Sequence, residues 1–194
     1  MNEPMGLRRA VAIVAILNLA YFGVEFSVAV SIGSVALIAD SVDFLEDASV
    51  NFLIFVALAW TAARRARVGM LLAGVLLVPV LAFLWSLWAK LGEPLPPAPM
   101  PMSITGFGAL AVNLTCAYLL VRHRHVGGSL SRAAFLSARN DAFANIAIIA
   151  AGIVTAAYPS VWPDIVVGLA IAILNIGAAK EVWEAARTEH DAAS

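Results

Sequence analysis

The segment IADSVDFLEDASVN, residues 38–51, places four acidic residues inside an otherwise apolar stretch of the chain. At 3.6 residues per helical turn, one face of this segment carries Asp40, Asp43, Asp47 and Asn51 within an arc of roughly 80°. Glu46 lies at the flank of that stripe. An acidic residue near the centre of a membrane costs at least ~2.5 kcal/mol, so a stripe of this density indicates a functional face inside a bundle.

The rest of the chain has the composition of a membrane protein. Its 194 residues are 62% hydrophobic and 13% charged, and the mean hydropathy is +0.90. A soluble domain typically has about 25% charged residues. The net charge of −1 gives no basic tail for nucleic acid, and the single Cys116 provides neither a disulfide nor a thiolate zinc site.

Six segments are long and apolar enough to cross a membrane, which requires about 20 residues for a hydrocarbon core of ~30 Å. They are residues 10–31, 34–63, 68–91, 103–121, 132–157 and 164–185. We therefore predict an all-α membrane protein, a bundle of six transmembrane helices over residues 10–185. Short cytoplasmic tails are expected at residues 1–9 and 186–194.

The positive residues predict the orientation of this bundle. With a cytoplasmic N-terminus, the cytoplasmic side carries Arg8, Arg9, Arg64, Arg65, Arg67, Arg122, Arg124, Arg132, Lys180 and Arg187. The opposite side carries Lys90. Because lysine and arginine concentrate in cytoplasmic loops, both termini are predicted to face the cytoplasm. We expect the protein in the inner or plasma membrane of the cell.

The fifth predicted helix carries a second polar face. Ser137, Asn140, Asp141 and Asn145 span an arc of roughly 140°, with Asp141 close to its middle. Asp43 lies about nine residues from the start of the second helix, and Asp141 about nine from the start of the fifth. Both are thus ~14 Å deep, measured from opposite faces. The two carboxylates are predicted to meet near the midplane.

This arrangement predicts a metal site built from oxygen donors. Asp43 and Asp47, four residues apart, can converge on one ion. Asp141 would close the site from the facing helix, and Ser137 and Asn140 would supply further coordination. Oxygen ligands favour Mn²⁺ or Fe²⁺ over a softer ion, while zinc also accepts carboxylates. The expected cargo is Mn²⁺, Zn²⁺, Fe²⁺ or Co²⁺, and no prosthetic group is expected.

Four further polar residues are predicted to support the metal ligands or to carry protons. Asn51 and Asn145 extend the two acidic stripes. Asp40 could support the ligands, carry protons or lie in a wet vestibule. Glu25 in the first helix could line an access path for ions or make a helix contact.

These residues resemble the transmembrane domain of the cation diffusion facilitator, or cation efflux, family. The run GSVALIADS, residues 33–41, followed by Asp43 and Asp47, is similar to that family's second helix, in which two ligands lie four residues apart. The run AAFL, residues 133–136, followed by Ser137 and Asp141, resembles its fifth helix. The resemblance extends over nearly the whole chain.

The resemblance implies a metal/proton antiporter that works by alternating access, usually as a homodimer, and exports divalent metal. The chain departs from the family at two points. Ser137 stands where members commonly have His or Asp, and the usual C-terminal cytoplasmic domain does not follow the sixth helix.

Two other functions use the same features. An intramembrane aspartyl protease also needs two facing aspartates, which share a proton to activate water. The extra acids of the second helix and the absence of a Gly-x-Gly-Asp motif argue against this enzyme. A regulator or metal sensor that does not transport is the other alternative. We expect a transporter, not an enzyme.

Overall fold

A computed structural model describes residues 3–57, 80–121 and 128–174 of the chain. Within these ranges, the side chains of residues 3–5, 7, 56–57 and 128–139 are outside the description.

The described residues form helices and no strand. The four longest helices are α1 (Glu3–Ile32), α2 (Val35–Ala57), α4 (Pro99–Val121) and α5 (Gly128–Ala157). Two shorter helical segments, Val80–Gly92 and Trp162–Leu174, complete six. The prediction of an all-α protein with six helices is confirmed.

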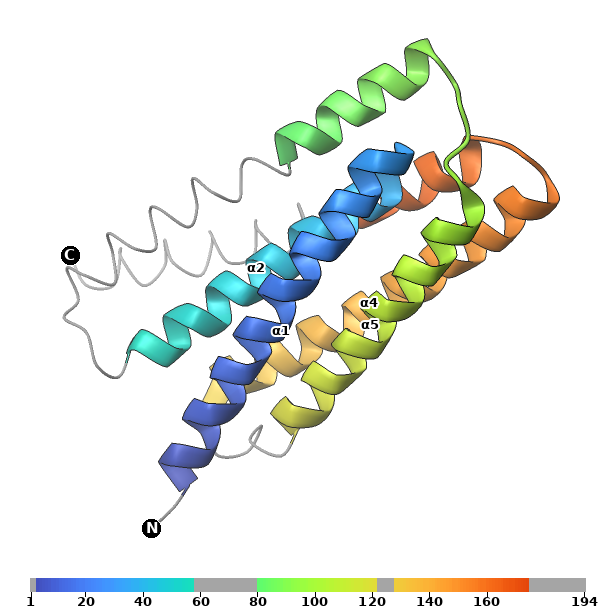
Figure 1. Ribbon diagram of the computed structural model, residues 1–194. Coiled ribbons are helices and arrows are strands. Elements are labelled where there is room, and N and C mark those ends of the chain that lie inside the picture. Colours follow the sequence, from blue (N-terminus) through green and yellow to red (C-terminus); the bar gives the residue numbers. More distant parts are fainter. Residues whose placement is uncertain (1–2, 58–79, 122–127, 175–194) are drawn as a thin grey trace.

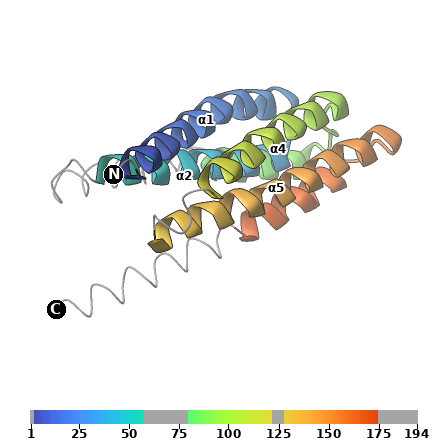
Figure 2. The same cartoon turned by 90° about the horizontal axis from the view of Figure 1, so that it is seen from below.

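The four long helices lie side by side in two closely packed pairs (Figures 1 and 2). α1 packs along α2, and α4 packs along α5. The pairs meet where α1 contacts α4 and where α2 contacts α5. The acidic helix α2 is thus next to α5, as the predicted site requires. Below, the end of the bundle where α1 turns into α2 is called the turn end, and the opposite end is called the N-terminal end.

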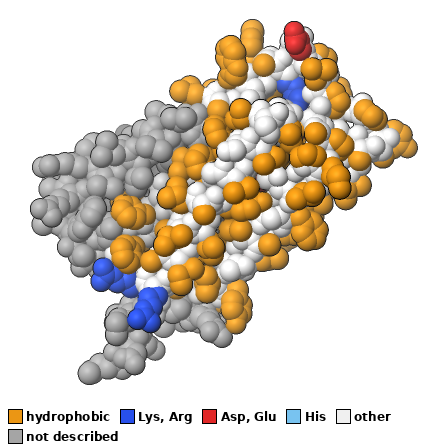
Figure 3. Space-filling model, viewed as in Figure 1, with side chains coloured by type: hydrophobic (Ala, Val, Ile, Leu, Met, Phe, Trp, Pro, Cys, Tyr) orange, Lys and Arg blue, Asp and Glu red, His pale blue; other side chains and the backbone are white. Residues whose placement is uncertain are grey.

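The surface of the bundle is that of a membrane protein. Three described helices are long and apolar enough to span a membrane: Arg8–Ile32, Pro99–Val121 and Asn140–Ala157. In Figure 3 hydrophobic side chains cover most of the described face, while positive and acidic groups lie near its two ends. Exposed Arg8 and Arg9 belong to the N-terminal end, and exposed Glu93 follows the helix that ends at Gly92.

Three helices begin earlier than predicted. α1 begins at Glu3 instead of residue 10, α4 at Pro99 instead of residue 103, and α5 at Gly128 instead of residue 132. Prolines explain the difference in α4, since Pro99 and Pro101 occupy its first turn. Backbone N–H groups there have no partner within the helix, so proline is tolerated. The predicted segment, residues 103–121, left both prolines outside the helix.

The turn between α1 and α2 is made by two residues. Gly33 has a φ of 65°, in the left-handed region that favours glycine. The N–H of Ser34 donates to the carbonyl of Ala29 at 3.0 Å, which closes a Schellman motif at the end of α1. Ser34 then caps α2, because its Oγ accepts a hydrogen bond from the N–H of Leu37 at 3.2 Å.

The interior has apolar clusters toward both ends and a polar layer between them. At the turn end, a cluster includes Ala29, residues 35–39, Met102 and Ile148. At the N-terminal end, a smaller one contains Val11, Val14, Cys116 and Leu120. The buried polar residues between them along the helices include Asn18, Glu25, Asp40, Asn113 and Asn145. Among the described residues, apolar side chains therefore lie on both sides of this layer along the bundle.

Candidate metal site

The acidic stripe of α2 faces the interior of the bundle. Asp40 is fully buried, and Asp43 and Asp47 are half-buried. Asn51, one turn further on, is buried, and its Nδ2 donates to the backbone carbonyl of Asp47 at 2.8 Å. Asp40 and Asn51 are therefore buried on the face that the helical periodicity predicts, and the role of this face as a metal site stays a prediction.

α5 presents Asp141 to the same region. Asp141 is half-buried, and its carboxyl interacts electrostatically with those of Asp47 and Asp40 on α2. The carboxyl of Asp43 in turn interacts with that of Asp141. The acids that the depth argument paired thus influence one another, and their meeting at one site stays a prediction. Because all of these groups carry the same sign of charge when ionised, they repel one another and favour a cation among them.

The structure describes the side chain of only one of the two polar residues, Ser137 and Asn140, that are predicted to bind metal beside Asp141. Asn140 is exposed on the surface of α5, turned away from the interior that Asp141 faces. The side chain of Ser137 lies outside the described residues. Their participation as ligands stays a prediction. Among the side chains that are described, no three of His, Cys, Asp or Glu are gathered closely enough to form a metal site, so the ligand set also stays a prediction.

A chain of hydrogen bonds connects three helices on the turn-end side of Asp43 and Asp141. Asn113 of α4 donates through Nδ2 to Oδ1 of Asn145 on α5 at 3.1 Å. Asn145 donates through its own Nδ2 to Oδ2 of Asp40 on α2 at 2.5 Å. All three residues are buried. Because Asn145 is four residues after Asp141 and Asp40 three before Asp43, this chain fixes the register of the two acidic helices.

Glu25 of α1 faces the same layer. Its side chain is 0% exposed, and neither carboxyl oxygen has a hydrogen-bond partner. The carboxyl interacts electrostatically with those of Asp40 and Asp43. Oδ1 of Asp40 is likewise buried without a partner. Both roles considered for Glu25, lining an access path for ions and making a helix contact, stay predictions.

A second polar cluster lies at the turn end, and sequence reasoning missed it. Asp164 accepts hydrogen bonds from Oγ of Ser34 at 2.7 Å and from the N–H groups of Val35 and Ala36 at 2.9 and 3.0 Å. It also pairs with Nζ of Lys90 at 2.6 Å, and Nζ donates to the carbonyl of Gly33 as well.

Asp164 therefore caps the first turn of α2 from the sixth helical segment, and Lys90 neutralises it from the third. The sequence analysis treated Lys90 only as a positive residue on the outer side. Lys90 lies in an otherwise apolar segment, and a lysine in such a segment is rarely buried unless an acidic residue pairs with it. This pattern could have predicted the ion pair.

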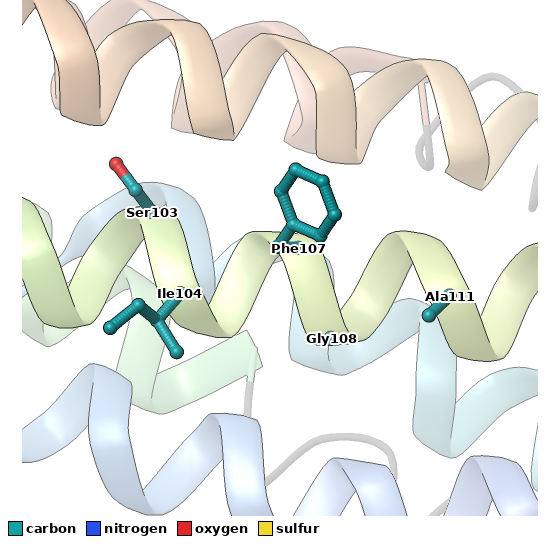
Figure 4. Close-up of a pocket in the computed structure, with 5 residues that line it drawn as sticks. All are labelled: Ser103, Ile104, Phe107, Gly108 and Ala111. Atoms are coloured by element: carbon teal, nitrogen blue, oxygen red, sulfur yellow. The ribbon is translucent and has the colours of Figure 1, made fainter.

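The described surface also has an open groove of about 510 Å³ on α4, lined by Ser103, Ile104, Phe107, Gly108 and Ala111. Figure 4 shows Ser103 and Phe107 on one side of α4 and Ile104 on the other. Its lining contains no acidic residue, and apolar side chains dominate it. It is separate from the acidic layer and fits a surface in contact with lipid.

The family model of the cation efflux transmembrane domain matches residues 11–188. No curated protein matches the chain. The matched range begins within α1 and includes the other described helices and every acidic residue of the interior layer.

Proposed function

Because the chain belongs to the cation efflux family of metal cation transporters, we propose that it exchanges a divalent metal ion for protons across the membrane. The metal is bound between α2 and α5, with Asp43, Asp47 and Asp141 as ligands. Ser137 and Asn140 are the proposed additional donors, and Asp40, Asn51, Asn145 and Glu25 support the site or carry protons.

The observation that supports this proposal is that the acidic helix α2 packs against α5, with half-buried acids on both helices. Asp43 on α2 and Asp141 on α5 interact electrostatically. The two residues are 98 positions apart in the sequence. Acidic residues are unfavourable neighbours in a protein interior, because burying their charges and bringing like charges together both cost free energy. A divalent cation offsets both effects.

Exchange for protons follows from the chemistry of the ligands. Metal and protons compete for the same carboxylate oxygens, since a carboxyl must be deprotonated to bind a metal. A pH gradient can therefore load the site on one side of the membrane and unload it on the other. In the proposed orientation both termini face the cytoplasm, and metal leaves that compartment.

The test is metal flux into proteoliposomes with an imposed pH gradient. Native protein is compared with Asp43→Asn and Asp141→Asn, which keep side-chain size but remove the charge, and with Glu93→Gln as an exposed control. Mn²⁺, Zn²⁺, Fe²⁺ and Co²⁺ are measured in parallel. We expect gradient-dependent flux of at least one ion in native and Glu93→Gln protein, and none in the two site variants.

Absence of flux of every ion in folded native protein would contradict the transporter. If that protein still bound metal, the result would favour the sensor. Flux without dependence on the pH gradient would contradict antiport and leave the metal transporter in place.

A further inference from the structure

Two carboxyls in the polar layer have oxygens with no partner. Glu25 on α1 and Asp40 on α2 are both 0% exposed. Oε1 and Oε2 of Glu25 and Oδ1 of Asp40 are buried and accept no hydrogen bond from an N–H or O–H group, and the two carboxyls contact each other. No described lysine, arginine or histidine forms an ion pair with either group. An ionised carboxyl in a dry interior requires a positive partner.

The hydrogen bonds to Asp40 show which form of its carboxyl is favoured. Asn113 donates to Asn145, so the amide of Asn145 must present its N–H₂ group to Asp40. Oδ2 of Asp40 is therefore an acceptor, which suits an ionised carboxylate. Metal-binding carboxylates are commonly oriented in this way by a hydrogen bond to one oxygen, which leaves the other oxygen for the ion.

We propose that Glu25 and Asp40 form a second binding site for the divalent cation, on the turn-end side of Asp43 and Asp141. This site rests on the proposed transport function and adds a step to it. Asp40 precedes Asp43 by three residues, which is ~4.5 Å along the helix axis. An ion can thus move between the two sites by less than one helical turn.

The carboxyl oxygens of Glu25 and Asp40 suit a site that an ion occupies briefly during transport. The two carboxyls offer three oxygens that accept no hydrogen bond from an N–H or O–H group, all of the type that hard divalent ions prefer. Water must complete the coordination, so binding is weaker than in a closed site. An ion on a transport path must bind strongly enough to enter and weakly enough to leave, and adjacent sites allow this.

The experiment counts Mn²⁺ ions bound per chain. Full-length protein in detergent is stripped with a chelator and equilibrated with Mn²⁺ by dialysis. We expect two ions for native protein and for the exposed control Glu93→Gln, and one ion for Glu25→Gln, Asp40→Asn and Asp43→Asn. The double variant Glu25→Gln with Asp43→Asn should bind none.

A second measurement guards against misfolding. Glu25→Gln removes a buried charge without changing side-chain size, so in chelator it should melt at or above the Tm of native protein. Added Mn²⁺ should raise the Tm of native protein more than that of Glu25→Gln, and Glu25→Asp should regain part of the difference.

The second site is wrong if folded Glu25→Gln binds as many Mn²⁺ ions as native protein. It is also wrong if Glu25→Gln changes only the number of protons taken up on acidification, because the pair would then hold protons. Either result leaves the proposed function standing as long as Asp43→Asn abolishes flux. Failure of that function would instead show as absence of flux in native protein.

Discussion

Replacing Asp164 with alanine removes the acceptor of four hydrogen bonds at the turn end of the bundle. Two come from the backbone N–H groups of Val35 and Ala36, one from Ser34 and one from Lys90. The variant leaves the ammonium of Lys90 buried, 6% exposed, without its carboxylate. It also removes one of the two caps of α2, while Ser34 still accepts from Leu37.

The expected loss of stability is large. Removing one partner of a buried ion pair costs ~3–5 kcal/mol, and losing a helix cap costs ~1 kcal/mol. Because Ser34 keeps part of the cap, we expect ~4 kcal/mol for Asp164→Ala, roughly a thousandfold change in the unfolding equilibrium. Lys90→Met should cost less, ~2–3 kcal/mol, since three donors to Asp164 remain. The double variant should cost less than the sum by ~2 kcal/mol.

Equilibrium unfolding in mixed micelles, followed by far-UV circular dichroism, measures these differences. Glu93→Gln is the matched control, because Glu93 is an exposed acid close to Lys90 in the sequence. A loss below ~1 kcal/mol for Asp164→Ala would show that the pair contributes no more than an exposed one. Additive effects of the two single variants would refute the direct coupling of Lys90 with Asp164.

Two further predictions concern packing. A Cβ at Gly168 would lie 3.0 Å from the backbone N of Ala36, so Gly168→Ala should destabilise the protein by ~1–3 kcal/mol in the same unfolding assay. Gly23→Ala, where a Cβ meets nothing within 4 Å, should be neutral or stabilising, and equal losses would contradict this contact. Cys116 is 0% exposed, so its thiol should react with a maleimide at least ~100-fold more slowly in folded than in denatured protein. Rapid labelling of the folded protein would show that α4 is packed differently.

The acid at the turn end, Asp164, differs from the acids of the polar layer in its hydrogen-bond partners. Asp164 has a full set of partners: one lysine, two backbone N–H groups and a serine. Such a carboxylate is explained by structure alone. Glu25 and Asp40 have unpartnered oxygens in an equally buried place. A bound cation would stabilise buried carboxyl oxygens of this kind. The proposed cation sites therefore lie in the polar layer and not at the turn end.

The sequence by itself determined the class of fold and the acidic faces. Helix length and apolar composition follow from the thickness of the membrane, and the period of 3.6 residues put Asp40, Asp43 and Asp47 on one side of α2. These are local properties of the chain, so no knowledge of its neighbours was needed. Equal depth also predicts that Asp43 pairs with Asp141, because two spanning helices share one membrane, and this pairing stays a prediction.

The tertiary structure decided which polar groups meet. The polar arc of the fifth helix was too wide to face inward as a whole, and packing buried Asn145 while leaving Asn140 exposed. The bonds of Asn145 with Asp40 and of Asp164 with Ser34 join residues more than 100 positions apart. Periodicity gives the face of each helix but neither its partner nor its rotation against that partner. Those are fixed by side-chain packing between helices, which only the folded bundle provides.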